Sequence, residues 1–206
     1  MIKRVHAEAM TTRNPTTEQP HSGRRSQTDI GREPRLGIDI GRVIIDGASH
    51  PGGGDTAFFT GDEATLLDTP EMPDSFETIA RLVEAFDGRV WLVSKCGQRV
   101  QERTLRWLAA HRFYDRTGVP CDQVRFCRAR AEKRLHCEEL GLTHFIDDHP
   151  EVHAAIRGVV EHQYFYGPQS RPVPSYGVWL PTWAAVEAAP GIAAAAQWIK
   201  ENPTRF

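Results

Sequence analysis

The segment "RLGIDIGRVIID" (residues 35–46) decides the interpretation of this chain because it places a carboxylate between two apolar runs. Asp39 follows a short apolar stretch, and Gly37 and Gly41 flank it on both sides. A carboxylate buried without partners costs several kcal/mol. Asp39 is therefore expected either at the end of a strand, facing a cleft, or in a buried pair.

Short apolar runs like the one before Asp39 recur along the chain and predict β-strands. The expected strands cover residues 36–41, 89–95, 123–128, 143–148 and 162–167. Helical periodicity follows or precedes them over residues 73–86, 98–111, 132–141 and 150–159, with a C-terminal helix within 188–203 that docks through Trp198 and Ile199. Near-continuous apolar strands that alternate with amphipathic helices predict an α/β fold: a three-layer, Rossmann-like arrangement with a mainly parallel sheet between helices.

The composition fits a globular protein, with 40% hydrophobic and 25% charged residues among 206. A net charge of -2 gives no indication of nucleic-acid binding. No apolar run approaches the roughly 20 residues of a membrane helix, and no secretory signal is recognisable at the start. The cysteines (Cys96, Cys121, Cys127 and Cys137) occur singly. We expect a cytoplasmic protein with reduced thiols.

Two segments differ in composition from the rest of the chain. Residues 1–34 are poor in large apolar side chains and are predicted to be a disordered, mildly basic tail. Residues 35–206 form the predicted core. Within it, residues 42–72 are mostly Gly-rich and irregular, and their position directly after Asp39 favours a functional flap.

Polar residues collect at the predicted strand ends. In an open α/β sheet, ligands bind outside the carboxyl ends of the strands. Ser94, Asp147 and Asp148 lie there with Asp39, and Lys133 precedes the fourth strand. Three clustered carboxylates repel one another unless a cation lies among them, and oxygen ligands suit Mg²⁺. A divalent cation, a lysine and a hydroxyl at one point are typical of a phosphate site.

Four motifs in this order resemble those of the haloacid dehalogenase (HAD) superfamily of phosphohydrolases. They are "GIDIGRV" (37–43), "VWLVSK" (90–95), "RAEKRLH" (130–136) and "HFIDDHPEV" (144–152). Each motif alone is common, but the ordered set over residues 36–150 is fairly specific. The resemblance implies a HAD-type fold without a large cap domain.

The resemblance also implies roles for individual residues. Asp39 would be the nucleophile, which forms an aspartyl-phosphate, and a ligand of Mg²⁺. Ser94 and Lys133 would hold the phosphoryl oxygens. Asp148 would bind the metal, with Asp147 assisting directly or through water. The implied metal ligands are thus Asp39, Gly41 (through its backbone carbonyl), Asp147 and Asp148.

Gly41 departs from the family's common pattern, which has a second Asp there as general acid and base. Such catalysis typically contributes about 10²–10⁴-fold. The flap offers His50, Asp46 and Asp55 as substitutes. Three interpretations stay open: a phosphatase with a displaced acid, a slow enzyme for good leaving groups, and a phosphate-binding relic without catalysis.

Simpler interpretations exist for the site residues. Asp39 could cap the following loop, Ser94 could be a small residue at a tight turn, and Lys133 could belong to a solvated basic face. Asp147 and Asp148 could cap the helix that begins at Pro150. Cys96 could be a thiol of lowered pKa, although a small residue fitting a turn is the preferred interpretation. Arg99, Arg103 and Arg106 are interpreted as a solvent-exposed helix face, with contact to the substrate as the alternative.

The predicted substrate is a phosphomonoester of unspecified class. Residues 42–72 are too few for a helical cap domain, and residues 129–132 hold no insertion. We expect an open site that accepts large phosphorylated substrates or is closed by a partner subunit. A nucleotide, a sugar phosphate and a phosphoprotein all remain candidates. A receiver domain is disfavoured because its acidic pair comes on the first strand, and a dehalogenase does not need these lysine and metal carboxylates.

Overall fold

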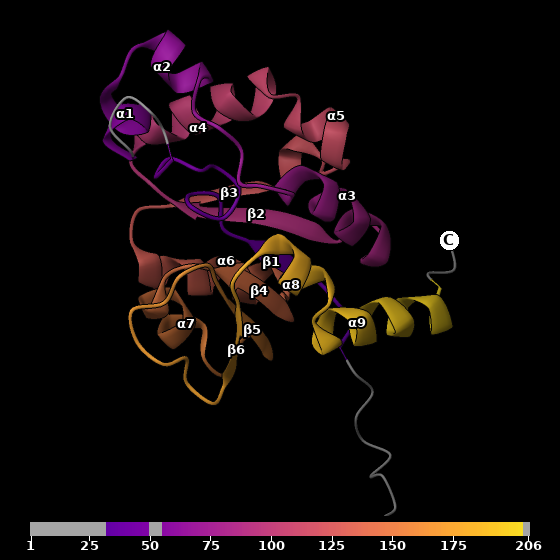
Figure 1. Ribbon diagram of the computed structural model, residues 1–206. Helices are drawn as coiled ribbons and strands as arrows, with labels where there is room; N and C mark the ends of the chain where they lie inside the picture. Colours follow the sequence, from indigo (N-terminus) through magenta and orange to yellow (C-terminus); the bar gives the residue numbers. More distant parts are fainter. Residues whose placement is uncertain (1–31, 50–54, 204–206) are drawn as a thin grey trace, which may run out of the picture. The chain divides into compact units, whose positions relative to one another are not determined.

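The computed structural model describes residues 32–49 and 55–203 (Figure 1). Most of the predicted tail and the candidate acid His50 lie outside these ranges. Residues 32–34 belong to the part that is described. There the Arg32 guanidinium donates to the carbonyl of Val159 at 3.3 Å, and Glu33 pairs with Arg35 at 3.0 Å.

The core is a six-stranded sheet in which every pair of neighbouring strands is parallel. The strand order is β3-β2-β1-β4-β5-β6. The strands are β1 (Leu36–Ile38), β2 (Val90–Lys95), β3 (Val124–Cys127), β4 (His144–Asp147), β5 (His162–Tyr166) and β6 (Gly177–Leu180). This confirms the predicted α/β class with a parallel sheet. The edge strand β6 was not predicted.

The predicted helices are present as α3 (Ser75–Ala85), α4 (Gln98–Ala110), α6 (Lys133–Leu140), α7 (Pro150–Ile156) and α9 (Pro190–Glu201). Two short helices that were not predicted are α5 (Phe113–Thr117) and α8 (Trp183–Glu187). The flap also contains α1 (Asp55–Thr60) and α2 (Glu63–Leu67), so its expected irregularity is wrong for these residues. Among the described residues, no helix is both long and apolar enough to cross a membrane.

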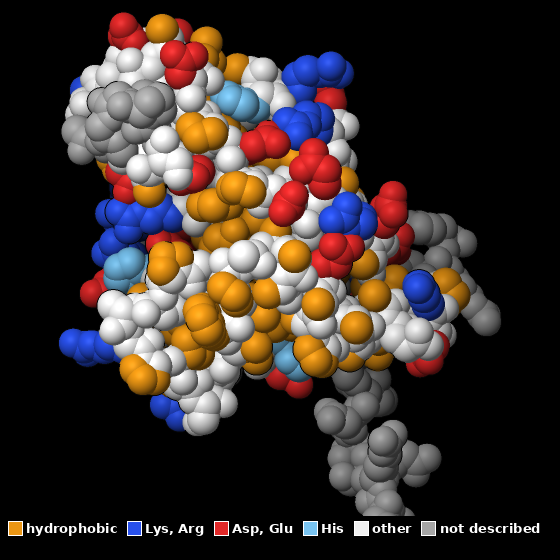
Figure 2. Space-filling model, in the orientation of Figure 1, with side chains coloured by type: hydrophobic (Ala, Val, Ile, Leu, Met, Phe, Trp, Pro, Cys, Tyr) orange, Lys and Arg blue, Asp and Glu red, His pale blue; other side chains and the backbone are white. Residues whose placement is uncertain are grey.

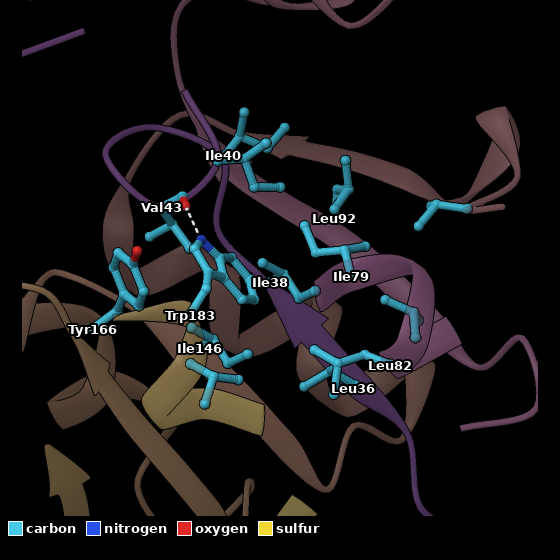
Figure 3. Packing of buried hydrophobic residues seen from close by; sticks show 14 of the residues in the cluster. Leu36, Ile38, Ile40, Val43, Ile79, Leu82, Leu92, Ile146, Tyr166 and Trp183 are labelled. Carbon is cyan, nitrogen blue, oxygen red and sulfur yellow. Dashed lines mark hydrogen bonds between the residues drawn. The ribbon is translucent and has the colours of Figure 1, made fainter. Parts of the chain in front are cut away.

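The two faces of the sheet carry separate apolar clusters because side chains alternate along each strand. Leu36 and Ile38 face the larger cluster, to which α3, α4, α8 and α9 contribute (Figure 3). Phe145 and Val93 face the smaller cluster, with side chains of α6 and α7. Helices therefore cover both faces, as in the three-layer arrangement that the sequence predicts. Ile199 of α9 belongs to the larger cluster with Trp198 packed against it, as expected.

Two contacts fix the backbone around the end of β1. Gly37 lies against β4, where a Cβ atom would come within 2.4 Å of the Phe145 ring, so only glycine permits this close approach. The indole of Trp183 donates to the carbonyl of Val43 at 2.8 Å (Figure 3). Strand β1 and the loop after it are thus held on both sides of Asp39.

Ion pairs link the surface elements around α3 and α5. Arg116 of α5 pairs with Glu71 at 2.6 Å and with Glu77 of α3 at 3.0 Å. Figure 2 shows acidic and basic side chains mixed in this region, while hydrophobic side chains are spread over the same face of the molecule. Exposed pairs of this kind contribute little stability each. The fold is therefore held mainly by the two apolar clusters.

Candidate functional site

Adjacent strands bring the predicted site residues to one edge of the sheet. Ile38 lies opposite Ile146 in the β1–β4 register, and the amide of Asp39 donates to the carbonyl of Ile146 at 2.9 Å. Asp39 and Asp147 consequently lie side by side at neighbouring strand ends. A cavity of about 320 Å³ opens at this edge. Its lining includes every site residue predicted from the sequence: Asp39, Gly41, Ser94, Lys133, Asp147 and Asp148.

Lys133 is a buried cation that holds two of the carboxylates. It is the first residue of α6, and its Nζ lies 2.6 Å from Asp39 Oδ1 and 2.7 Å from Asp147 Oδ2. The side chain is only 2% exposed, so its interpretation as part of a solvated basic face is wrong. Burial alone would lower the pKa of Lys133, but the charges of Asp147 and Asp39 raise it above its ordinary value. Lys133 therefore stays protonated between them.

The three carboxylates of Asp39, Asp147 and Asp148 each offer an oxygen within 4.8 Å of the others. Burial raises the pKa of Asp39 to about 6, against the lowering effect of Lys133. Burial, and then the charge of Asp39, raises the pKa of Asp148 to about 7. The single positive charge of Lys133 thus does not balance the negative charges of three ionised carboxylates. Such a set of oxygen donors could hold a divalent cation, which would favour the ionised carboxylates.

The two neighbouring acids have different surroundings. Asp147 is 1% exposed, and its second oxygen accepts a hydrogen bond from the amide of His149 at 2.8 Å. The carboxylate of Asp148 is partly exposed and accepts no hydrogen bond within the described part of the chain. Asp148 therefore has the freer oxygens. The N-cap of α7 is His149, whose ring accepts from the Glu151 amide at 3.3 Å, so Asp147 and Asp148 are not the cap.

Ser94, the penultimate residue of β2, is buried and lines the same cavity. Gly41 lines it as well, and a Cβ atom added there would meet no atom within 4 Å. The place where the family pattern has a second Asp is therefore open space. Asp46, a candidate substitute, accepts from the Ser49 amide at 3.1 Å and is not part of the cavity lining. Asp55 does line the cavity.

Asp55 is engaged in an ion pair at the rim of the cavity. Arg42 donates to the same Asp55 oxygen through Nε, at 2.7 Å, and through Nη2. Arg42 has a φ of 61°, a left-handed conformation that is uncommon for a residue with a side chain. The pair joins the loop after Gly41 to the start of α1. Two further cations line the rim: Lys95, and Arg130, which lies 3.4 Å from Glu151.

The flap supplies an aromatic wall that was not predicted from the sequence. Phe58 and Phe59 of α1 line the cavity with Ile45 and Val100. Their rings meet edge to face, with centroids 5.8 Å apart. Phe58 is buried, whereas Phe59 is 43% exposed. The apolar "AFF" triplet (57–59) in an otherwise polar segment was the available signal.

A buried arginine anchors this wall. Nε of Arg103, on α4, donates to the carbonyl of Phe58 at 2.7 Å, and Nη2 lies 3.4 Å from the carbonyl of Asp62. Arg103 is only 5% exposed, so its assignment to a solvent-exposed face is wrong. Burial lowers its pKa below the ordinary range. The flap helices are therefore attached to the core by a specific, charged contact.

Cys96 is not an activated thiol. It lines the cavity, but burial, together with the charges of Cys127 and Asp39, raises its pKa to about 11. The preferred interpretation as a small residue near the turn agrees with this environment. All four cysteines are free.

Neither of two comparisons with known proteins identifies a relative of this chain. A scan against models of protein families finds no match, and a search among curated proteins finds none either.

Proposed function

We propose that this protein is a Mg²⁺-dependent phosphomonoester hydrolase that works through an aspartyl-phosphate on Asp39. The observation that carries the proposal is the convergence on one cavity of three carboxylates, a buried lysine and a serine. The resemblance to the HAD superfamily assigns the same residues to phosphoryl transfer. Geometry and motif order therefore support one interpretation.

The donor set fits magnesium. Asp39, Asp147 and Asp148 present only carboxylate oxygens, the hard donors that Mg²⁺ prefers, and Asp148 has oxygens without protein partners in the described residues. Burial raises the pKa of Asp39 and of Asp148, and the charges of neighbouring carboxylates raise both further. When bound, the ion would neutralise charge on the phosphoryl group.

The protein's own groups account for the first chemical step. Lys133 fixes Asp39 through Oδ1, which leaves Oδ2 to attack phosphorus. A bond forms between that oxygen and phosphorus, and the bond from phosphorus to the leaving oxygen breaks with its electron pair. Ser94 and Lys133 hold the phosphoryl oxygens while their charge develops. Lys133 also keeps Asp39 ionised, as the nucleophile must be.

In the second step, water attacks phosphorus, the bond to Asp39 breaks, and inorganic phosphate leaves. The proton of that water passes to solvent or to the phosphoryl oxygens, because Gly41 offers no side chain to accept it. We therefore expect dephosphorylation to be the slow step, with a burst of released alcohol before steady turnover.

A second function, binding of a phosphate group without turnover, is favoured by one observation, the open space at Gly41. A relic of this kind would keep the cation and lysine but lack acid-base catalysis. It would bind a phosphorylated ligand in the same cavity and release it unchanged.

Hydrolysis of p-nitrophenyl phosphate tests the choice. We expect turnover with Mg²⁺, its loss in EDTA, and its loss in Asp39→Asn. Asp122→Asn, on the exposed segment before β3, is the matched control and should keep full activity. A folded wild-type protein that binds Mg²⁺ but shows no turnover above Asp39→Asn would contradict the enzyme and support the phosphate-binding function.

A further inference from the structure

We propose that the substrate is an aryl phosphomonoester, an ester whose leaving oxygen is bonded directly to an aromatic ring. This inference rests on the proposed function and names its substrate class. Two independent features carry it: the Phe58–Phe59 wall beside the carboxylates, and the open space at Gly41.

The wall gives the cavity that contains the carboxylates an aromatic surface. Phe59 is 43% exposed although a large apolar side chain gains free energy from burial, and Phe58 lies edge to face against it. Ile45 and Val100 extend the apolar lining. A polyol such as a sugar would lose hydration against this surface without gaining hydrogen bonds. An aromatic ring would instead stack or pack edge to face on Phe59.

The wall is a built feature of the fold. Arg103 is buried to hold the Phe58 carbonyl at 2.7 Å, and Arg42 holds Asp55 at the start of α1. Both contacts fix α1 from outside the apolar surface. The aromatic side chains are therefore positioned before a ligand arrives, which reduces the entropy lost on binding.

The open space at Gly41 points to the same class through the chemistry of the leaving group. An aliphatic alcohol is about as weak an acid as water, so its oxygen needs a proton as the ester bond breaks. A phenol has a pKa of about 10, like that of tyrosine, and leaves as phenolate. The phenolate then takes its proton from solvent at the rim. An aryl ester is thus the class that a site without an acid at position 41 can cleave.

The described flap carboxylates do not change this conclusion. Asp46 is not part of the cavity lining, and Asp55 is bound by two guanidinium nitrogens of Arg42. Arg42 thus already engages the Asp55 carboxylate.

A binding measurement tests this inference independently of the proposed hydrolysis. Titration calorimetry with Mg²⁺ should show that phenylphosphonate, which has no hydrolysable ester bond, binds at least tenfold more tightly than methylphosphonate. Phe59→Ala should remove about five- to tenfold of that preference. The matched control Leu67→Ala, at a 40% exposed position of α2 outside the cavity lining, should leave it unchanged. Equal binding of the two phosphonates, or an equal effect of both variants, would overturn the inference.

Turnover tests the leaving-group argument with three esters. Phenyl phosphate has a ring and a phenolic oxygen, benzyl phosphate a ring and an aliphatic oxygen, and ethyl phosphate neither. We expect kcat/KM, which reports the step that breaks the ester bond, to be more than 10²-fold higher for phenyl phosphate than for benzyl phosphate. Gly41→Asp should reduce this ratio by about 10²-fold by restoring an acid, whereas Gly41→Ala should not. Equal kcat/KM values of the wild type for phenyl and benzyl phosphate would contradict the inference while leaving the phosphatase intact.

A fourth ester distinguishes a protein substrate from a small aryl phosphate. A phosphotyrosyl peptide cleaved more efficiently than phenyl phosphate would identify a protein substrate. The reverse order would identify a small aryl ester. Absence of Mg²⁺-dependent turnover with every ester would instead contradict the proposed function, and the phosphonate titrations would still decide whether the wall selects a ring.

Discussion

Asp39 illustrates how one buried carboxylate acquires a role from its neighbours. Its side chain is 11% exposed, and Lys133 shares its charge between Asp39 and Asp147. Removal of one partner from a buried ionic group leaves an uncompensated charge, which costs far more than the net gain of forming the group. The conformation of Asp39 is therefore coupled to the stability of the whole core.

This coupling predicts the effect of Lys133→Met. Without the ammonium group, the carboxylates of Asp39 and Asp147 would be buried without a cation between them. We expect the free energy of unfolding in EDTA to fall by about 3–5 kcal/mol, measured by urea denaturation. Lys95→Met is the control, because Lys95 is exposed on the same cavity rim and should change stability by less than about 0.5 kcal/mol. Equal losses in the two variants would show that Lys133 is not a buried ionic centre.

His144 predicts a pH dependence of stability. It is buried at the start of β4, stacked on His162 with ring centroids 4.4 Å apart, and burial lowers its pKa to about 3. The unfolded state takes up a proton at about pH 6.5, but the folded state does not. The stability contribution of neutral His144 is therefore complete above about pH 6.5 and is lost as the pH falls toward the folded-state pKa.

We expect the free energy of unfolding of the wild type to change between pH 7.5 and 5.5 by about 1.4 kcal/mol more, in the destabilising direction, than that of His144→Gln. Asp39 and Asp148 have raised pKa values and contribute with the opposite sign, but they are common to both proteins and cancel in the difference. Identical pH slopes would show that His144 titrates normally in the folded state.

Among the helices and strands, those strands that carry the site were predictable because buried strands appear in the sequence as apolar runs. Strands β1, β2 and β4 are nearly continuous apolar runs, and the polar residues at their ends stand out against them. Parallel pairing then requires those ends to meet. The positions of Asp39, Ser94 and Asp147 thus follow from periodicity and topology together.

The helices and strands that were not predicted lack such apolar runs. Strand β6 has only four residues, and two of them, Val178 and Trp179, are about half exposed at the sheet edge. Helices α1 and α2 have six and five residues and follow a Gly-rich stretch, so propensity alone could not predict them. Their conformation depends on tertiary contacts, which include those of Arg103 and the burial of Phe58 and Leu66. The aromatic wall could not be placed in the cavity without them.

Arg103 therefore predicts the local stability of the flap. Arg103→Met removes the donors to the Phe58 and Asp62 carbonyls, and we expect amides of α1 and α2 to exchange hydrogen about 10–100-fold faster. Amides of α3 should keep their wild-type rates. Arg106→Met breaks only an exposed pair with Glu63 and should have little effect. Unchanged exchange in α1 for Arg103→Met would mean that other contacts hold the flap.

At the scale of the whole described molecule, the strand order explains why the site lies where it does. Strand β1 is central, with β2 on one side and β4 on the other, so three strand ends surround Asp39. Helix α6 precedes β4 and delivers Lys133 from the side of the smaller apolar cluster, while the flap closes the opposite side through α1. The sheet thereby supplies the charged end of the cavity, and the flap supplies the apolar end.

The proposed mechanism requires that Asp39 becomes phosphorylated. Its most direct test is to quench the protein with acid during p-nitrophenyl phosphate turnover in Mg²⁺, reduce the acyl phosphate with borohydride, and locate the product by peptide mass spectrometry. Reduction converts a phosphorylated aspartate to homoserine. We predict homoserine at position 39 and its absence in EDTA. Turnover without modification at Asp39, or with modification at Asp147 or Asp148 instead, would contradict the account.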